Sequence, residues 1–268
     1  MNDTSHYVIA GGEEGKRRLN VLADAMYPFT KSLLEKMGVK EGISFLDNGC
    51  GGGNVSLMVA KMVGNGKVTA IDFDEAIIEL AKQDAIDGNI TNVSFEMNTA
   101  YAIGSSNEFD IVYARFLLSH LEKPLDALKN MVRAAKKDAM IVVEDLQFSG
   151  HFCYPANDAY DQYLQLYTEV VKRKGGNAEI GPMLINLFKQ SRISNVEFDI
   201  IQPTFTKGHG KWMAYLTLEK IKAAVVNEGL ATALDIDVLL QKLKIFTEDK
   251  NSMMSLPRIF RVWGRKIE

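Results

Sequence analysis

The sequence predicts an α/β protein: a Rossmann-like, doubly wound and mostly parallel sheet of seven strands with a helical cap insertion. From residue 43 to residue 144, short apolar segments alternate with helical ones at the spacing of βαβ units, which implies parallel strands with right-handed crossovers. A turn rich in glycine joins the first of these apolar segments to a helix. After residue 145 the alternation stops and helical patterns dominate, so we expect an insertion there.

The chain before the sheet is helical in its second part. Residues 19–37 carry an apolar stripe at helical spacing, and Gly38 suits the end of that helix. Pro28 is expected to kink or divide it. Residues 1–18 are polar and contain three glycines.

The first strand, residues 43–47, ends in Asp47, and four glycines follow within residues 49–53. Glycine accepts unusual backbone angles and lets a ligand approach the main chain, and the first amides of the following helix lack partners within it. This combination is typical of a nucleotide or cofactor site. The residues that we expect to contact the ligand here are Asp47, Gly49, Cys50, Gly51, Gly53 and Asn54.

The second strand, residues 67–72, also ends in an acid. A carboxylate at this point of a parallel sheet lies beside the glycine turn of the first strand, where it can accept hydrogen bonds from ribose hydroxyls. Either Asp72 or Asp74 could instead cap the helix expected at 75–87; we assign Asp72 to the ribose and Asp74 to the cap. Phe73 could lie against an adenine ring or belong to ordinary packing.

The remaining elements follow in order. The pattern predicts further strands at 92–97, 109–114, 139–144, 195–205 and 258–264, helices at 124–135, 158–174 and 182–191, and mostly helix over 209–249. We expect residues 145–156 to form a loop. The resulting division is an N-terminal helical cover (1–37), a Rossmann-like core (38–150), a helical cap insertion (151–192), and C-terminal strands (193–268) with a helical insertion at about 206–252.

The spacing Asp47-x-Gly49-x-Gly51-x-Gly53 resembles motif I of the class I S-adenosylmethionine (SAM) dependent methyltransferases. The segment 115–121 after the fourth strand is similar to that of the methyltransferases of ubiquinone and menaquinone biosynthesis. The dinucleotide fingerprint, in contrast, needs glycine at position 54 or 56, where this chain has Asn54 and Ser56. The resemblance covers residues 29–144 and, weakly, the closing strands. It implies SAM as cofactor, S-adenosylhomocysteine (SAH) as product, and an antiparallel last strand.

The resemblance also implies further site residues. In the family, an acid after the third strand often meets the adenine amino group; here Thr99 and Ala100 take that position, and the hydroxyl of Thr99 can still form a hydrogen bond. Thr99 could equally be a turn residue. The main chain after the fourth strand meets the methionine end of the cofactor in the family, which makes Arg115 and His120 candidates. His120 could instead be a histidine held in a helix.

The segment from Tyr7 to Arg18 is expected to close over the cofactor. Tyr7 can bury against the pocket, and Arg18 offers a forked donor for the carboxylate of SAM. The segment resembles the amino-terminal portions that cover the site in related small-molecule methyltransferases. The alternative is a tail followed by a charged first helical turn.

Methyl transfer from a sulfonium is an in-line displacement, so the protein must align donor and acceptor and exclude water. A general base is needed only if the acceptor must lose a proton. Candidates follow the fifth strand, beside the expected methyl group: Glu144, Asp145, His151 and Tyr154, of which we assign His151 and Tyr154. His151 could also be an ordinary surface histidine. Aromatic residues predict an apolar acceptor pocket here: Phe148, Phe152, Tyr154, Tyr160 and Tyr163.

The composition of the chain limits the kinds of partner that we expect it to bind. A net charge of −3 argues against a broad nucleic-acid surface. No apolar run is long enough to cross a bilayer and the amino terminus has no signal-peptide core, so we expect a cytoplasmic location and no membrane span. The four histidines and two cysteines show no metal-ligand spacing, and the fourth strand ends without an acid, so we expect no metal.

We therefore predict a SAM-dependent methyltransferase that methylates a small molecule by metal-independent in-line displacement. Two alternatives remain: a non-catalytic, methyltransferase-like subunit that binds SAM, and an NAD(P)-dependent oxidoreductase, which the glycine spacing disfavours. The sequence leaves open which atom accepts the methyl group and how many copies of the chain assemble.

Overall fold

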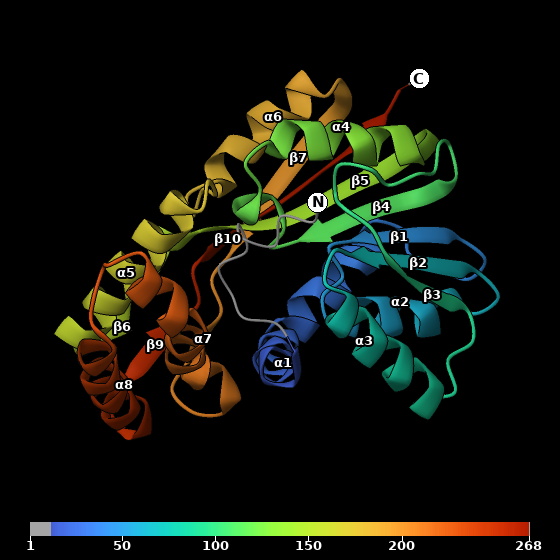
Figure 1. The fold of residues 1–268 in the computed structure, drawn as a ribbon. Helices are drawn as coiled ribbons and strands as arrows, with labels where there is room; N and C mark the ends of the chain where they lie inside the picture. Colours follow the sequence, from blue (N-terminus) through green and yellow to red (C-terminus); the bar gives the residue numbers. More distant parts are fainter. Residues whose placement is uncertain (1–11, 268) are drawn as a thin grey trace.

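The computed structural model describes residues 12–267, and these form a sheet covered by helices on both faces (Figure 1). The helices are α1 (Gly12–Lys36), α2 (Asn54–Val63), α3 (Glu75–Asp87), α4 (Pro124–Ala134), α5 (Asp158–Arg173), α6 (Leu184–Gln190), α7 (Met213–Asn227) and α8 (Ala233–Glu248). The strands are β1 (Ser44–Asn48), β2 (Lys67–Asp72), β3 (Val93–Met97), β4 (Phe109–Arg115), β5 (Ala135–Gln147), β6 (Cys153–Tyr154), β7 (Ile193–Ile201), β8 (Thr204–Phe205), β9 (Met253–Ser255) and β10 (Arg258–Lys266).

The main sheet has seven strands in the order β3-β2-β1-β4-β5-β10-β7. Strands β1 to β5 pair in parallel, while β10 runs antiparallel to both of its neighbours. The predicted doubly wound, mostly parallel sheet is therefore confirmed. The strand order reverses between β1 and β4, and in such sheets a crevice opens at the carboxyl ends of the strands where this reversal occurs.

The central strands are buried on both faces, which explains their nearly continuous apolar sequences. Within β4, Val112 and Tyr113 point to opposite faces and both are fully buried. Val112 belongs to a core beneath α4 and α6, and Tyr113 to a core beneath α1 and α2. These two cores hold the β1 and β4 ends in a fixed position beneath the crevice.

A second group of helices, α5, α7 and α8, packs on its own apolar core at one end of the sheet (Figure 1). A small antiparallel sheet of three strands, β6-β9-β8, completes this group, which we call the cap. Helix α6 falls within the predicted insertion 151–192 but packs on the main sheet through Leu184 and Phe188. The division of the chain into cover, core and insertion stays a prediction.

Several boundaries differ from the sequence prediction. The fifth strand spans Ala135–Gln147 instead of 139–144, because polar residues at its start obscure the apolar pattern. The predicted loop at 145–156 therefore contains the end of β5, a single helical turn and β6. Pro28 lies inside one helix, α1, and does not divide it. The small sheet was missed because strands of two or three residues carry no alternation.

Within residues 12–267, none of the helices combines the length and the apolar character that a membrane crossing requires.

The cap is expected to depend on its buried leucines. Leu243 of α8 is fully buried in the cap core, so Leu243→Ala should lower the free energy of unfolding by about 2–5 kcal/mol through lost contacts and a residual cavity. Leu234 lies in the same helix but is 72% exposed, so Leu234→Ala should change it by less than about 0.5 kcal/mol. Urea unfolding of both variants checks this, and equal effects would contradict the buried position of Leu243.

Candidate active site

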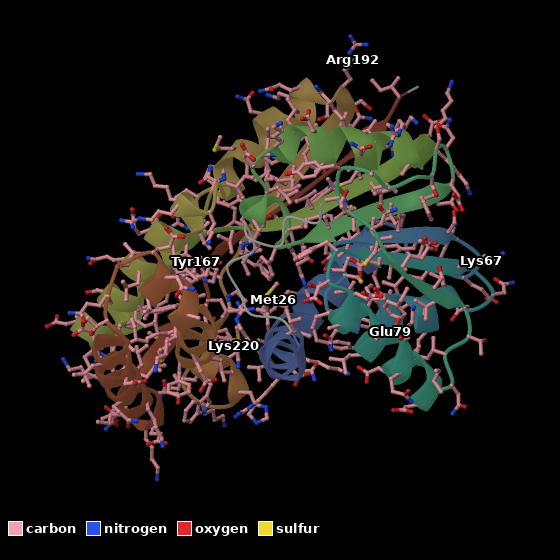
Figure 2. The ribbon with its side chains drawn as sticks, viewed as in Figure 1. Met26, Lys67, Glu79, Tyr167, Arg192 and Lys220 are labelled. Atoms are coloured by element: carbon pink, nitrogen blue, oxygen red, sulfur yellow. The ribbon has the colours of Figure 1, made fainter. Side chains whose placement is uncertain are left out.

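A cavity of about 620 Å³ opens at the carboxyl ends of β1, β2 and β4, between the sheet and the cap. Its wall includes residues of α1, the loop 49–53 between β1 and α2, the segments after β2, β3 and β4, and helices α5 and α7. Figure 2 shows the side chains of the cap and of α1 meeting beside the sheet, with Tyr167 on the cap and Met26 on α1. The cavity thus joins the crevice of the sheet to the cap.

The loop 49–53, which we call the glycine loop, requires glycine for two reasons. Gly49, Gly51 and Gly53 have φ of 78°, 51° and 77°, in the region that other residues rarely adopt. A Cβ on Gly49 would lie 2.8 Å from Leu117, and one on Gly53 would lie 2.8 Å from the ring of Phe95. Gly49, Cys50, Gly51 and Asn54 line the cavity, as predicted for ligand contacts, whereas Gly53 does not and serves the packing of α2.

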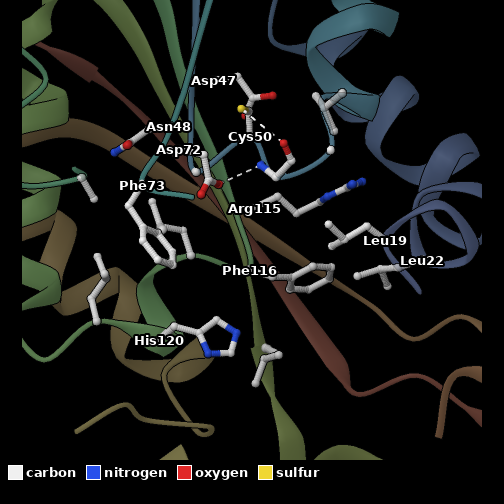
Figure 3. Close-up of a pocket in the computed structure, with 18 of the residues that line it drawn as sticks. Leu19, Leu22, Asp47, Asn48, Cys50, Asp72, Phe73, Arg115, Phe116 and His120 are labelled. Carbon is white, nitrogen blue, oxygen red and sulfur yellow. Dashed lines mark hydrogen bonds between the residues drawn. The ribbon is translucent and has the colours of Figure 1, made fainter. Parts of the chain in front are cut away.

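Asp72, at the end of β2, holds the glycine loop in place. Its Oδ2 accepts a hydrogen bond from the amide of Gly51 at 2.9 Å (Figure 3), and its Oδ1 accepts one from the amide of Asp74 at 3.1 Å. Burial raises the pKa of Asp72, and these backbone amides oppose that shift. A carboxylate has about four acceptor sites, so two remain for a ligand.

The neighbours of Asp72 follow the sequence prediction. Asp74 caps α3 by accepting hydrogen bonds from the amides of Ala76 and Ile77, which confirms its assignment as a cap. Phe73 lines the cavity with 36% of its surface exposed and lies beside Asp72 in Figure 3. The adenine side of the predicted site therefore contains an aromatic ring.

Thr99 and Ala100 line the same part of the cavity, after β3. The side chain of Asn98 accepts a hydrogen bond from the amide of Thr99, and the carbonyl of Thr99 accepts one from Ala102. These bonds form a turn that presents the exposed Thr99 side chain at the cavity. Both readings of Thr99, turn residue and ligand contact, are thus compatible with its position.

Asp47 and Arg115 form the charged floor beneath the glycine loop. Asp47 is 2% exposed and accepts a hydrogen bond from Ser56 Oγ at 2.6 Å. Burial raises the pKa of Asp47 to about 6, although the bond from Ser56 and the charge of Arg115 lower it. Arg115 Nη1 donates to Thr30 Oγ1 at 3.2 Å, which fixes the guanidinium on this side of the cavity.

The two acids of β5 are not available as bases. Glu144 is fully buried outside the cavity wall, and its Oε1 accepts hydrogen bonds from Thr30 at 2.8 Å and Tyr113 at 2.5 Å. Asp145 is also fully buried and accepts a bond from the amide of Ser119, and burial raises its pKa to about 6. Glu144 ends the predicted strand 139–144 and Asp145 follows it; β5 continues through both and turns them inward.

A second arginine lies on the cap side of the cavity. Arg18 is 8% exposed, and its Nε donates to Thr217 Oγ1 of α7 at 3.0 Å. Burial raises the pKa of the Tyr163 phenol to about 12, although the charge of Arg18 and the nearby hydroxyl of Thr217 lower it. Tyr163 is therefore protonated at neutral pH. Among the described residues, no Asp or Glu lies within ion-pair distance of Arg18.

Two histidines also line the cavity on the side that faces the cap. Burial lowers the pKa of His151 to about 4, and burial together with the charge of Arg18 lowers that of His120 to about 4. Both are therefore neutral at pH 7. Nδ1 of His151 lies 2.8 Å from the carbonyl oxygen of Phe148 and must donate to it, so Nε2 carries the lone pair.

Aromatic rings form the wall around His151. Phe148 stacks on Tyr167 with ring centroids 3.9 Å apart and an interplanar angle of 16°. Tyr163 meets Phe148 edge-on at 5.8 Å. Of the five aromatic residues predicted for the acceptor pocket, Phe148 and Tyr163 line the cavity; Phe152, Tyr154 and Tyr160 do not.

Tyr154, assigned above as catalytic, lies apart from the cavity. It is 66% exposed in the short strand β6, where pairing with Met253 turns it toward solvent. We therefore set it aside. Tyr7, the other predicted contact near the amino terminus, lies outside the described residues.

Sequence reasoning missed several polar or aromatic residues of the wall, among them Asn48, Tyr167 and Thr217. Asn48 is fully buried, and neither polar atom of its amide has a hydrogen-bond partner within residues 12–267. Its signal was visible, since it is a polar residue that directly follows Asp47 at the carboxyl end of β1. Thr217 and Tyr167 carry no such signal, because they lie in helices whose packing the sequence does not reveal.

No group of three or more His, Cys, Asp or Glu side chains in the described part of the chain could hold a metal ion.

Comparison with known proteins places this geometry in a family. A sequence profile of the methyltransferase domain family matches residues 39–187. The chain is similar to demethylmenaquinone methyltransferase of Staphylococcus aureus (strain MRSA252), at 35% identity over 114 residues, which make up 42% of this chain and 46% of the relative. The chain thus spans about half the length of the curated relatives it matches.

Two solved structures share the fold. A candidate methyltransferase from Bacillus halodurans C-125 has a TM-score of 0.61 at 19% identity, covering 89% of this chain and 98% of that one. Phosphoethanolamine N-methyltransferase 2 of Haemonchus contortus, solved with S-adenosyl-L-methionine, has a TM-score of 0.55 at 15% identity, covering 99% of this chain and 55% of that one. At these identities the likeness concerns the fold.

The low pKa of His151 predicts a change in how stability depends on pH. Because its folded pKa of about 4 lies below the usual histidine pKa of 6.5, the unfolded chain binds more protons as pH falls, and stability present above pH 6.5 is lost toward pH 4. His151→Phe removes this loss. Between pH 7.5 and 5, wild type should therefore lose about 1–2 kcal/mol more unfolding free energy than the variant.

Urea unfolding at several pH values measures this difference. Comparison with the variant is necessary because Asp47 and Asp145, with raised pKa values, change stability in the opposite direction over a similar range. His209→Phe is the control, since His209 is exposed and should leave the wild-type dependence unchanged. Parallel curves for wild type and His151→Phe would contradict a buried neutral histidine.

Proposed function

The chain belongs to the methyltransferase domain family, within the class I SAM-dependent methyltransferases, and from this membership we propose that it transfers a methyl group from SAM to a small-molecule acceptor without a metal ion. One observation carries the proposal: a single cavity extends from the glycine loop and Asp72 to the aromatic wall of the cap. A cofactor at one end and an acceptor at the other would meet inside it. We also propose the cytoplasmic location expected from the sequence.

The residues present fit the proposed cofactor. The glycine loop leaves the main chain open where a Cβ would intrude, and Asp72 has acceptor sites left for ribose hydroxyls. Phe73, Thr99 and Ala100 would lie on the adenine side. Arg115 is the natural partner of the cofactor carboxylate, since it lies at the glycine loop (Figure 3).

SAM would supply a methyl group on a positively charged sulfur. The chain's own contribution is to hold the reactants in line and to exclude water. Helix α1 supports this by covering the glycine loop: Leu19 lies 3.3 Å from the position of a Cβ on Gly51, and Asn54 Nδ2 donates to Asn20 Oδ1 at 3.0 Å. Leu19 and Asn20 directly follow the segment 7–18 that the sequence predicts to close over the cofactor; of that segment Arg18 lines the cavity, and the closure stays a proposal.

His151 is the proposed proton acceptor. Its neutral ring, with Nδ1 bound to the carbonyl of Phe148, leaves Nε2 to accept a hydrogen bond from an acceptor hydroxyl or amine. A pKa of about 4 makes it a weak base. It would therefore orient the acceptor and take the proton only as the new bond to the methyl group forms.

The first test concerns the cofactor. We expect SAH, and not NAD or NADP, to raise the melting temperature of the protein, because Asn54 and Ser56 replace the glycines of the dinucleotide fingerprint. Asp72→Ala should weaken SAH binding roughly ten- to a hundredfold in calorimetry, since hydrogen bonds to a charged group contribute about 1.5–3 kcal/mol.

Asp74→Ala is the matched control. It removes the cap of α3 two residues away, so it should lower stability by about 1 kcal/mol and leave SAH affinity within about twofold. A rise in melting temperature with NAD alone would overturn the proposal.

A second experiment measures the transfer of a labelled methyl group from SAM to a panel of phenols, amines and quinols, with and without EDTA. Transfer separates an enzyme from a subunit that only binds SAM. Loss of transfer in EDTA would refute metal independence.

A further inference from the structure

We propose that Arg18, Thr217 and Tyr163 form a subsite for a carboxylate of the methyl acceptor, so that the substrate is a flat, apolar carboxylic acid. This inference rests on the proposed function, because it assigns the cap side of the cavity to the acceptor. It also revises the sequence-based expectation that Arg18 binds the carboxylate of SAM.

Arg18 carries a buried charge that no acid among residues 12–267 balances. Arg18 is 8% exposed, and an arginine side chain stays charged in proteins. A buried charge is costly unless it is paired. In the described chain, Arg18 has one hydrogen-bond partner, the neutral hydroxyl of Thr217. Its position on the cavity wall indicates that an anionic ligand supplies the missing charge.

One hydrogen bond orients the guanidinium of Arg18. Arg18 Nε donates to Thr217, which holds the guanidinium in one orientation and leaves both Nη groups for a ligand. Tyr163 lies in the same wall and is protonated at neutral pH, so its hydroxyl is a further donor. The subsite therefore offers donors to an oxygen anion.

The charge balance favours a carboxylate over a phosphate. Arg18 and Arg115 are the two cations of the described cavity wall, and Arg115 belongs to the glycine-loop side, where it lowers the pKa of Asp47. His120 and His151 are neutral. One positive charge on the cap side matches one carboxylate, whose two oxygens also fit the guanidinium fork, whereas a phosphate monoester carries nearly two charges at pH 7.

The walls around this subsite select the rest of the acceptor. Phe148, Tyr167 and Met213 contribute apolar surface, and the ring of Tyr163 lies among them. His151 carries a hydrogen-bond acceptor in the same wall, edge-on to Tyr163 with centroids 6.5 Å apart. A flat ring with a carboxylate on one side and a methylatable hydroxyl or amine on another satisfies these groups together.

The test uses probes that differ only in charge. Benzoate and benzamide, and cinnamate and cinnamamide, are titrated by calorimetry into protein saturated with SAH. At least one carboxylate should bind about tenfold or more tightly than its amide, as expected for a charged hydrogen-bonded pair. Arg18→Gln should abolish this preference, and Tyr163→Phe should weaken binding of the same carboxylate severalfold.

Control variants test whether Arg18 binds the carboxylate of the acceptor or the carboxylate of the cofactor. Arg17→Gln removes the exposed neighbour of Arg18 in α1 and should change nothing, and Arg18→Gln should leave SAH affinity within about twofold. If Arg18→Gln fails to fold, Thr217→Val tests the subsite, because it removes the hydrogen bond that orients the guanidinium and leaves the charge in place. This variant should reduce the carboxylate preference severalfold.

Three results would overturn the subsite. The first is a wild type that binds neither carboxylate more tightly than its amide. The second is a preference that survives in Arg18→Gln or in Thr217→Val. The third is a loss of SAH affinity of tenfold or more in Arg18→Gln, which would assign the anion to the cofactor. Failure of wild type to bind SAH would instead refute the proposed function itself.

Discussion

The hydrogen bond between Asp72 and the amide of Gly51 is the contact on which the site depends. It joins the end of β2 to the glycine loop after β1 and holds a stretch of main chain in left-handed conformations that would otherwise have many alternatives. The carbonyl of Ile71 accepts bonds from the amides of Gly49 and Cys50, so two neighbouring residues of β2 fix the whole turn. The position of α2, of the charged floor and of the cavity mouth all follow from this turn.

Helix α1 connects that turn to the cap. Lys16 forms an ion pair with Asp84 of α3 at 2.7 Å, whereas Arg18, half a turn further on, reaches Thr217 of α7. Farther along the helix, Thr30 accepts from Arg115 and donates to Glu144. One helix thus contacts the cofactor side, the buried acid of β5 and the cap, and a small movement of α1 would change all three together.

The sequence predicted the half of the site whose chemistry lies in short segments. The glycines of the loop, Asp72, and Asp74 as the residue that caps helix α3 can be recognised from short stretches of sequence. The structure brings them together as expected. The side of the cavity that faces the cap could not be predicted from the sequence. Arg18 and Thr217 are 199 residues apart, and only the packing of the helices makes them neighbours. Asp145 and Tyr154 lie in strands where the sequence predicted a loop: β5 continues through Asp145, and β6 contains Tyr154. The direction in which a side chain points depends on where a strand continues, and local sequence did not reveal either continuation.

The two arginines divide the cavity by charge. Arg115 faces Asp47 in the floor, so its charge is already partly balanced before any ligand arrives, while Arg18 faces neutral groups. The neutrality of His120 is itself a consequence of this arrangement, since both burial and the adjacent guanidinium lower its pKa. Were His120 and His151 charged at pH 7, the cap side would repel a cationic sulfur donor and attract polyanions. Because burial keeps them neutral, Arg18 is the one cation on the cap side of the described wall, and a single positive charge can discriminate a carboxylate from its neutral amide.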